Sequence, residues 1–214
     1  MTTEIEKHWL HVIEIHQYTK EFFILAEQHQ INYKTFLEVH QEPRHVLEHI
    51  IRAKSAELGL KPLLKKSSLN EYEKINMSKA LGHAYRGFFD AADFFSMSIS
   101  SNIDSLIKPY NHDCILHVFP EYYQTIQEDI FNLRTDIGYI RARKDVEIGD
   151  DILAEVKEYY GKCMALMTHY RTVLKHLGEL SRYKRNEINK MIISCIITFI
   201  LGIIATVVTT NIFK

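Results

Sequence analysis

An arginine and a histidine stand five positions apart at Arg44 and His49, in a stretch whose apolar residues have helical spacing. Along one helix this separation is about a turn and a half, which brings both side chains within reach of the same phosphodiester. The imidazole would act there as acid or base, while the guanidinium would steady the developing negative charge. One hypothesis is therefore metal-independent endoribonuclease chemistry at this pair.

This Arg-x4-His spacing resembles the motif of HEPN ribonucleases, which are helical-bundle domains that cut RNA when two copies pair. The resemblance implies a HEPN-like bundle with Arg44 and His49 as catalytic residues. Arg171 and His176 repeat the spacing as a second candidate pair, although Thr172 departs from the residue usual at the second position. A chain with twelve histidines produces such spacings readily, so ordinary helix residues are the alternative, and many HEPN folds lack nuclease activity.

The overlapping segment His45-x-x-Glu48-His49 matches an inverted zinc-protease pattern. Two imidazoles four residues apart would hold the metal, and the carboxylate between them would activate water. Proteases of that class are larger and contain sheet, and no third ligand follows at a recognisable spacing. We therefore expect no metal and no cofactor.

A further polar set comprises Arg86, Asp90 and Asp93, at spacings that share one helix face. Such spacing is typical of a structural polar network along a helix. Together with the basic and acidic residues at 141–145, the segment resembles small helical proteins carried near prokaryotic antiviral systems.

Residues 191–213 form an uncharged run of 23 residues, rich in Ile and Val. At about 1.5 Å per residue the run reaches about 34 Å as a helix, which is enough to cross a bilayer. The basic residues before it outnumber the single Lys214 after it, and this asymmetry predicts that the N-terminal side is cytosolic. These flanking basic residues are Arg182, Lys184, Arg185 and Lys190. The expected organisation is a cytosolic bundle over residues 1–186 and a transmembrane anchor over residues 187–214.

Small or weakly polar residues recur at every fourth position of this run and form a ridge on one helix face. The ridge consists of Ser194, Thr198, Gly202, Thr206 and Thr210. It predicts association between membrane helices, most simply between copies of this chain. The alternative is that the hydroxyls only bond their own backbone carbonyls.

The hydrophobic pattern predicts an all-α, antiparallel helical bundle whose long C-terminal helix leads into the membrane. Helices are expected over residues 4–29, over 33–58 with a restart at Pro43, and over 68–107 behind a Ser68 cap. Others are expected from Pro120 to about 140 and from 152 onward, with loops at 59–68 and 111–119 and a turn at Gly149 and Asp150. The last helix carries a heptad-like seam consisting of Ile152, Val156, Tyr159, Cys163, Leu166, Tyr170, Val173, Leu177 and Leu180.

Composition supports this class, because 8 Gly and 4 Pro are too few for a many-stranded β fold. A net charge of −1, from 26 basic and 27 acidic residues, provides no general attraction to nucleic acid. The three dispersed cysteines fit a reducing compartment, and no export segment is recognisable at residues 1–7.

The whole plan resembles the compact membrane-associated accessory proteins encoded beside RNA-targeting CRISPR effectors, although here the membrane helix is C-terminal. That resemblance implies a tail-anchored, single-pass effector of the inner membrane that oligomerises and perturbs the bilayer, with the seam and the ridge as assembly surfaces. Its partners would be the bilayer, further copies of itself and a defence-system protein. The alternatives are a membrane-tethered HEPN ribonuclease or toxin, whose partner would be RNA, and an adaptor that recruits a protein to the membrane.

Overall fold

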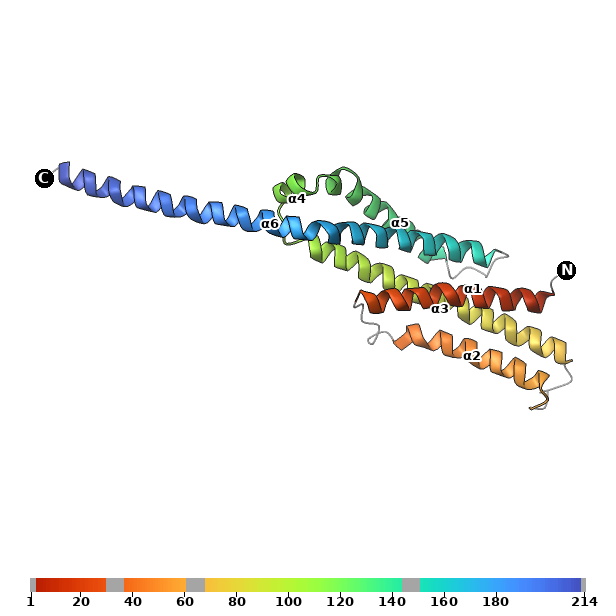
Figure 1. Ribbon diagram of the computed structural model, residues 1–214. Helices are drawn as coiled ribbons and strands as arrows, with labels where there is room; N and C mark the ends of the chain where they lie inside the picture. Colours follow the sequence, from red (N-terminus) through yellow and green to blue (C-terminus); the bar gives the residue numbers. More distant parts are fainter. Residues whose placement is uncertain (1–2, 30–36, 61–67, 144–150, 213–214) are drawn as a thin grey trace. The chain divides into compact units, whose positions relative to one another are not determined.

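The computed structural model describes residues 3–29, 37–60, 68–143 and 151–212, and every regular element in these ranges is a helix (Figure 1). The predicted all-α class is confirmed for this part of the chain, whereas the turn expected at Gly149 and Asp150 lies outside it, as does most of the loop expected at 59–68. The elements are α1 (Glu4–Gln28), α2 (Leu37–Glu57), α3 (Leu69–Ile107), α4 (His112–Val118), the π-helix η2 (Tyr122–Ile126), α5 (Gln127–Arg143) and α6 (Ile152–Ile212).

Local sequence signals set several helix ends. At the start of α1 the Glu6 amide donates to Thr3 Oγ1 (3.2 Å) and the Thr3 amide donates to Glu6 Oε2 (2.7 Å), which completes a capping box. At the start of α3 the Glu71 amide donates to Ser68 Oγ (3.3 Å), so the predicted Ser68 cap is confirmed. At the end of α2, Gly59 takes a φ of +67°, a left-handed conformation that a glycine adopts without strain.

Two local predictions are wrong. Residues 111–119 were expected to form a loop, but α4 occupies most of them, because Asn111 Oδ1 accepts from the Cys114 amide (2.8 Å) and Ile115 becomes buried. Pro43 lies inside α2 instead of restarting a helix. A proline inside a helix removes one backbone hydrogen bond, and here the Pro43 ring lies beside Gly87 of α3.

One compact unit consists of the described parts of Met1–Asn102 and Ile130–Thr168. Contacts between its helices show their directions: α2 runs antiparallel to α3, whereas α1, α3 and the first part of α6 run the same way (Figure 1). The pairs that show this are Glu42–His83 and His49–Asn76 between α2 and α3, Glu4–Lys74 and Phe22–Phe95 between α1 and α3, and Tyr85–Glu155 and Asp93–Tyr159 between α3 and α6.

The core of this unit is aromatic. The fully buried ring of Phe22 lies 5.7 Å from Phe88 and 5.0 Å from Phe95 between ring centroids, and 5.7 Å from Tyr160. Burial raises the pKa of the Tyr160 phenol, and a hydrogen bond with Glu21 raises it further. Rings from α1, α3 and α6 therefore join these helices around Phe22.

The second unit consists of the described parts of Ile103–Asp129 and His169–Lys214. Its short helix α4 is held on α6, because Cys114 Sγ contacts the Leu180 carbonyl (3.7 Å) and Tyr110 Oη lies 2.8 Å from Ser181 Oγ. The ring of His176 stacks on Phe119 with centroids 4.0 Å apart. These contacts lie at the last part of the α6 seam, where Leu180 is buried.

The heptad-like seam is therefore occupied within the chain. Eight of its nine residues are buried and Leu177 is half-buried, so the seam cannot also serve as an assembly surface as expected. Beyond Leu180, α6 continues without interruption to Ile212, and the predicted continuation into the apolar segment is confirmed. The boundary predicted at residue 186 falls inside this helix.

Candidate functional site

Titratable side chains gather where α2 lies against α3. Glu42, His45 and His49 project from one face of α2, since their spacings of three and four residues return to the same side of a helix. His83 faces them from α3, with ring centroids 4.9 Å from His45 and 5.3 Å from His49. We refer to Glu42, His45, His49 and His83 as the histidine cluster.

Hydrogen bonds orient two of the rings in the histidine cluster. His83 Nδ1 lies 2.7 Å from Glu42 Oε2 and His49 Nδ1 lies 3.0 Å from Asn76 Oδ1. Because Asn76 Nδ2 donates to the Tyr72 carbonyl (2.9 Å), Asn76 Oδ1 is left as an acceptor, and the proton of neutral His49 is assigned to Nδ1. The four side chains of the cluster are half-buried, and Glu42 and His83 each expose 20% of the side chain.

Gly87 permits this close approach of α2 to α3. A Cβ atom at Gly87 would lie 3.0 Å from Glu42 Cβ and 3.4 Å from Pro43 Cδ, whereas one at Gly138 in α5 would meet nothing within 4 Å. Alanine at residue 87 would therefore push against the backbone-proximal atoms of two α2 residues. Gly87 is needed to keep Glu42 near His83.

We expect Gly87→Ala and Gly138→Ala to change stability in opposite directions. Gly138→Ala should raise the free energy of unfolding by about 0.5–1 kcal/mol, because alanine is the better helix former. Gly87→Ala should lower it by about 1 kcal/mol, because overpacking outweighs the same propensity gain. Urea titration of both variants in detergent, followed by Trp9 fluorescence, measures the difference. An equal gain at the two positions would contradict the tight approach.

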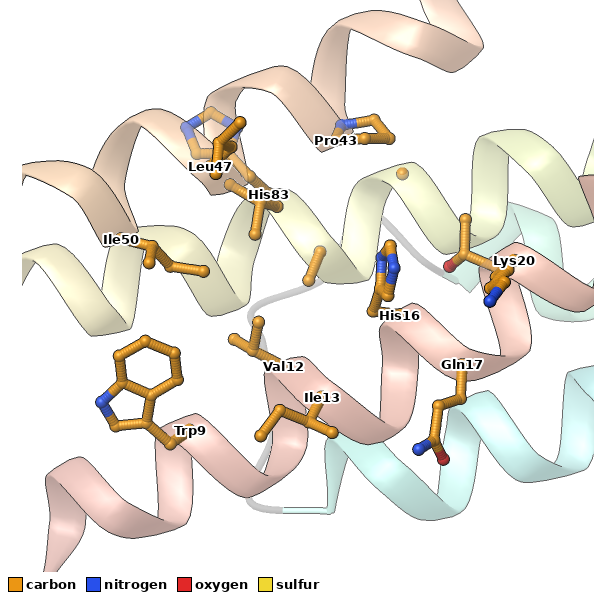
Figure 2. Close-up of a pocket in the computed structure, with 14 residues that line it drawn as sticks. Trp9, Val12, Ile13, His16, Gln17, Lys20, Pro43, Leu47, Ile50 and His83 are labelled. Atoms are coloured by element: carbon orange, nitrogen blue, oxygen red, sulfur yellow. The ribbon is translucent and has the colours of Figure 1, made fainter.

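An apolar cleft of about 520 Å³ adjoins the histidine cluster (Figure 2). Trp9 and Ile13 of α1 lie on one side, Leu47 and Ile50 of α2 lie on the other, and His83 of α3 lies near Leu47. His83 therefore belongs both to the cluster and to the cleft wall.

The Arg44 and His49 pair is placed less favourably for shared chemistry than its spacing suggested. Five residues along a helix turn through about 140° beyond a full turn. His49 is accordingly half-buried against α3, whereas Arg44 is exposed. The second pair is similar, with Arg171 exposed and His176 stacked on Phe119. Catalysis by either pair stays a prediction.

The other polar motifs have structural partners. Glu48 forms an ion pair with Arg52, so the carboxylate of the inverted zinc-protease pattern is engaged away from the histidines. Asp93 accepts a hydrogen bond from Tyr159 of α6. Arg86 points to α2, with its Nε 3.3 Å from Glu42 Oε2. Arg86 and Asp93 thus link α3 to other helices.

The basic residues before the apolar segment lie along α6. Lys184 Nζ donates to the Pro109 carbonyl (2.9 Å), and Lys190 Nζ donates to Glu187 Oε1 (2.8 Å), which raises the pKa of Lys190. Arg182 and Arg185 are exposed. Four cationic groups thus precede residue 191.

On the ridge, two threonine hydroxyls bond carbonyls of their own helix. Thr198 Oγ1 donates to the Ser194 carbonyl (2.9 Å) and Thr206 Oγ1 donates to the Gly202 carbonyl (2.8 Å). The ridge side chains from Ser194 to Thr206 are exposed, and the side chain of Thr210 lies outside the described ones. Any contact through this ridge would rest mainly on close packing of small residues.

Sequence reasoning missed Glu42 and His83. The i, i+3 spacing of Glu42 and His45 could have indicated that these two side chains share a helix face. His83 lies 41 residues from Glu42, and no local pattern links the two.

The sequence matches no family model, no curated protein and no solved structure in the comparisons made.

Proposed function

We propose that this chain is a single-pass membrane protein held in the inner membrane by residues 191–213, with its helical domain on the cytosolic side. The observation that carries this proposal is the exposure of α6 after Leu180. Every described side chain from Met191 to Thr209 is exposed, and the large apolar ones each expose about half of their surface or more. A contiguous apolar surface of this extent is not stable in water, whereas a bilayer covers it.

The charge distribution supports the proposed orientation. Four basic side chains stand in the nine residues before the apolar segment, at Arg182, Lys184, Arg185 and Lys190. Cytosolic flanks carry the excess of Lys and Arg, so the bundle would remain in the cytosol.

The class of activity we propose is that of membrane effectors of prokaryotic antiviral systems, which act by oligomerising and perturbing the bilayer. Support comes from the resemblance in plan and from the continuity of α6, which runs from Ile152 to Ile212 as one helix. Within the apolar segment, the ridge around Gly202 is exposed and consists of small side chains, which let two membrane helices approach closely.

Replacing the central glycine of the ridge tests this proposal. We expect Gly202→Leu to lower self-association in bilayers at least tenfold and to abolish depolarisation of cells that express the full chain, because a leucine keeps the backbones apart. Crosslinking in membranes and a potential-sensitive dye measure the two effects. The control Ile203→Leu, off the ridge, should change neither.

His49→Ala separates the alternatives. Loss of RNA integrity that requires His49 and proceeds without depolarisation would replace the effector proposal with the tethered ribonuclease. A membrane-bound protein that produces neither effect, and whose Gly202→Leu variant associates normally, would indicate an adaptor.

A further inference from the structure

We propose that Glu42, His45 and His83 bind a divalent first-row transition-metal ion of the Zn²⁺ type. The ligand atoms of these three side chains lie within 4.8 Å of one another. Ligand bonds of 2.0–2.2 Å place tetrahedral ligands roughly 3.3 Å apart. Small side-chain rotations therefore suffice to bring the three groups around one ion.

An unpartnered nitrogen is independent support for this site. His45 Nδ1 is buried and has no hydrogen-bond partner among the described residues. A buried polar atom without a partner carries a free-energy penalty, and a metal ion would remove it. This nitrogen belongs to a ring that lies against His83 and is three residues from Glu42.

His83 Nδ1 has two close neighbours, and it cannot form a hydrogen bond with both at once. Glu42 Oε2 lies 2.7 Å from this nitrogen and Arg86 Nη2 lies 2.9 Å from it. A guanidinium only donates, so Nδ1 cannot accept from Arg86 while it donates to Glu42. A cation shared by Glu42 and His83 would replace the proton between them, and Arg86, half-exposed, is free to turn toward solvent.

Neighbouring groups hold the ligands in place. The ring of His49 stacks on His83 at an interplanar angle of 17°, and His49 is itself fixed by Asn76. Outer contacts of this kind orient metal-binding imidazoles. His49 is therefore a positioning residue for His83.

The donor types indicate which ions fit. Two imidazoles and one carboxylate suit Zn²⁺ and its first-row neighbours, whereas Mg²⁺ and Ca²⁺ prefer oxygen donors throughout. Three protein ligands leave a fourth position for water. This ligand set differs from the inverted zinc-protease pattern, because it takes its carboxylate from Glu42 and its second histidine from α3.

The test uses the full chain in detergent, titrated calorimetrically with Zn²⁺ and spectroscopically with Co²⁺. We expect one equivalent of Zn²⁺ and the strong visible bands of tetrahedral Co²⁺. Glu42→Gln and His83→Ala should each weaken Zn²⁺ binding at least about 100-fold, since even outer-shell changes weaken it by about 10–100-fold. The control His11→Ala, which removes a histidine of α1, should bind as the parent does.

Arg86→Gln provides a result that misfolding cannot imitate. Removing the cation beside Glu42 should strengthen Zn²⁺ binding several-fold, because like charges repel. Circular dichroism of each variant checks that it is folded. Absence of binding by the parent, equal binding by His83→Ala, or no gain from Arg86→Gln would each overturn the proposal.

Discussion

Two lysines in the apolar part of α6, introduced as Ile200→Lys with Ile203→Lys, are expected to move the full chain out of the membrane fraction. Each charge near the centre of a membrane helix costs about 2.5–3.5 kcal/mol on insertion scales, so the pair costs roughly 5–7 kcal/mol. Ile200 and Ile203 are 49% and 50% exposed, and they lie off the ridge. A shift of the double-lysine variant out of the membrane fraction would therefore report on contact with lipid and not on contact through the ridge. High-speed centrifugation of cell lysates without detergent measures the distribution.

The matched control is Ile200→Leu with Ile203→Leu, which keeps an apolar surface at the same positions. This variant should sediment with membranes as the parent does. A parent chain that stays in the supernatant would remove the basis for the membrane proposal, and so would a double-lysine variant that sediments and resists carbonate extraction like the parent.

Phe22→Ala should lower the free energy of unfolding by about 3–5 kcal/mol, the range expected when a large buried ring is removed. Phe22 is fully buried and its ring contacts rings of Phe88, Phe95 and Tyr160, so α1 loses its central contact with α3 and α6. Urea unfolding in detergent, followed by Trp9 fluorescence, measures the change.

Phe131→Ala is the matched control for Phe22→Ala, because Phe131 is 68% exposed and belongs to the same unit. We expect its free energy of unfolding to change by less than about 0.5 kcal/mol. Similar losses for Phe22→Ala and Phe131→Ala would mean that the aromatic core does not stabilise the unit.

Features that depend on neighbouring residues were predictable from the sequence. The Ser68 cap, the glycine at the end of α2 and the unbroken helix from residue 152 into the apolar segment follow from hydrogen bonding within one turn and from hydropathy. The seam of α6 was also recognised from its heptad-like spacing, and eight of its nine residues are buried.

Features that depend on distant residues needed the structure. Pro43 lies inside α2, where α3 packs beside it. Residues of α4 form a helix whose Cys114 is buried in contact with Leu180 of α6. Local propensity favoured a break in the first case and a loop in the second, and burial against another helix outweighed it in both.

The same distinction between neighbouring and distant residues applies to the two candidate sites. The apolar helix that we propose as the membrane span was recognisable from the sequence itself, because its length and hydropathy depend on the composition of one continuous segment. The histidine cluster was decided only by the tertiary structure, because Glu42 and His83 are 41 residues apart and meet where Gly87 lets two helices approach. Spacing along one helix places side chains on a face, and only the packing of a second helix determines what they face.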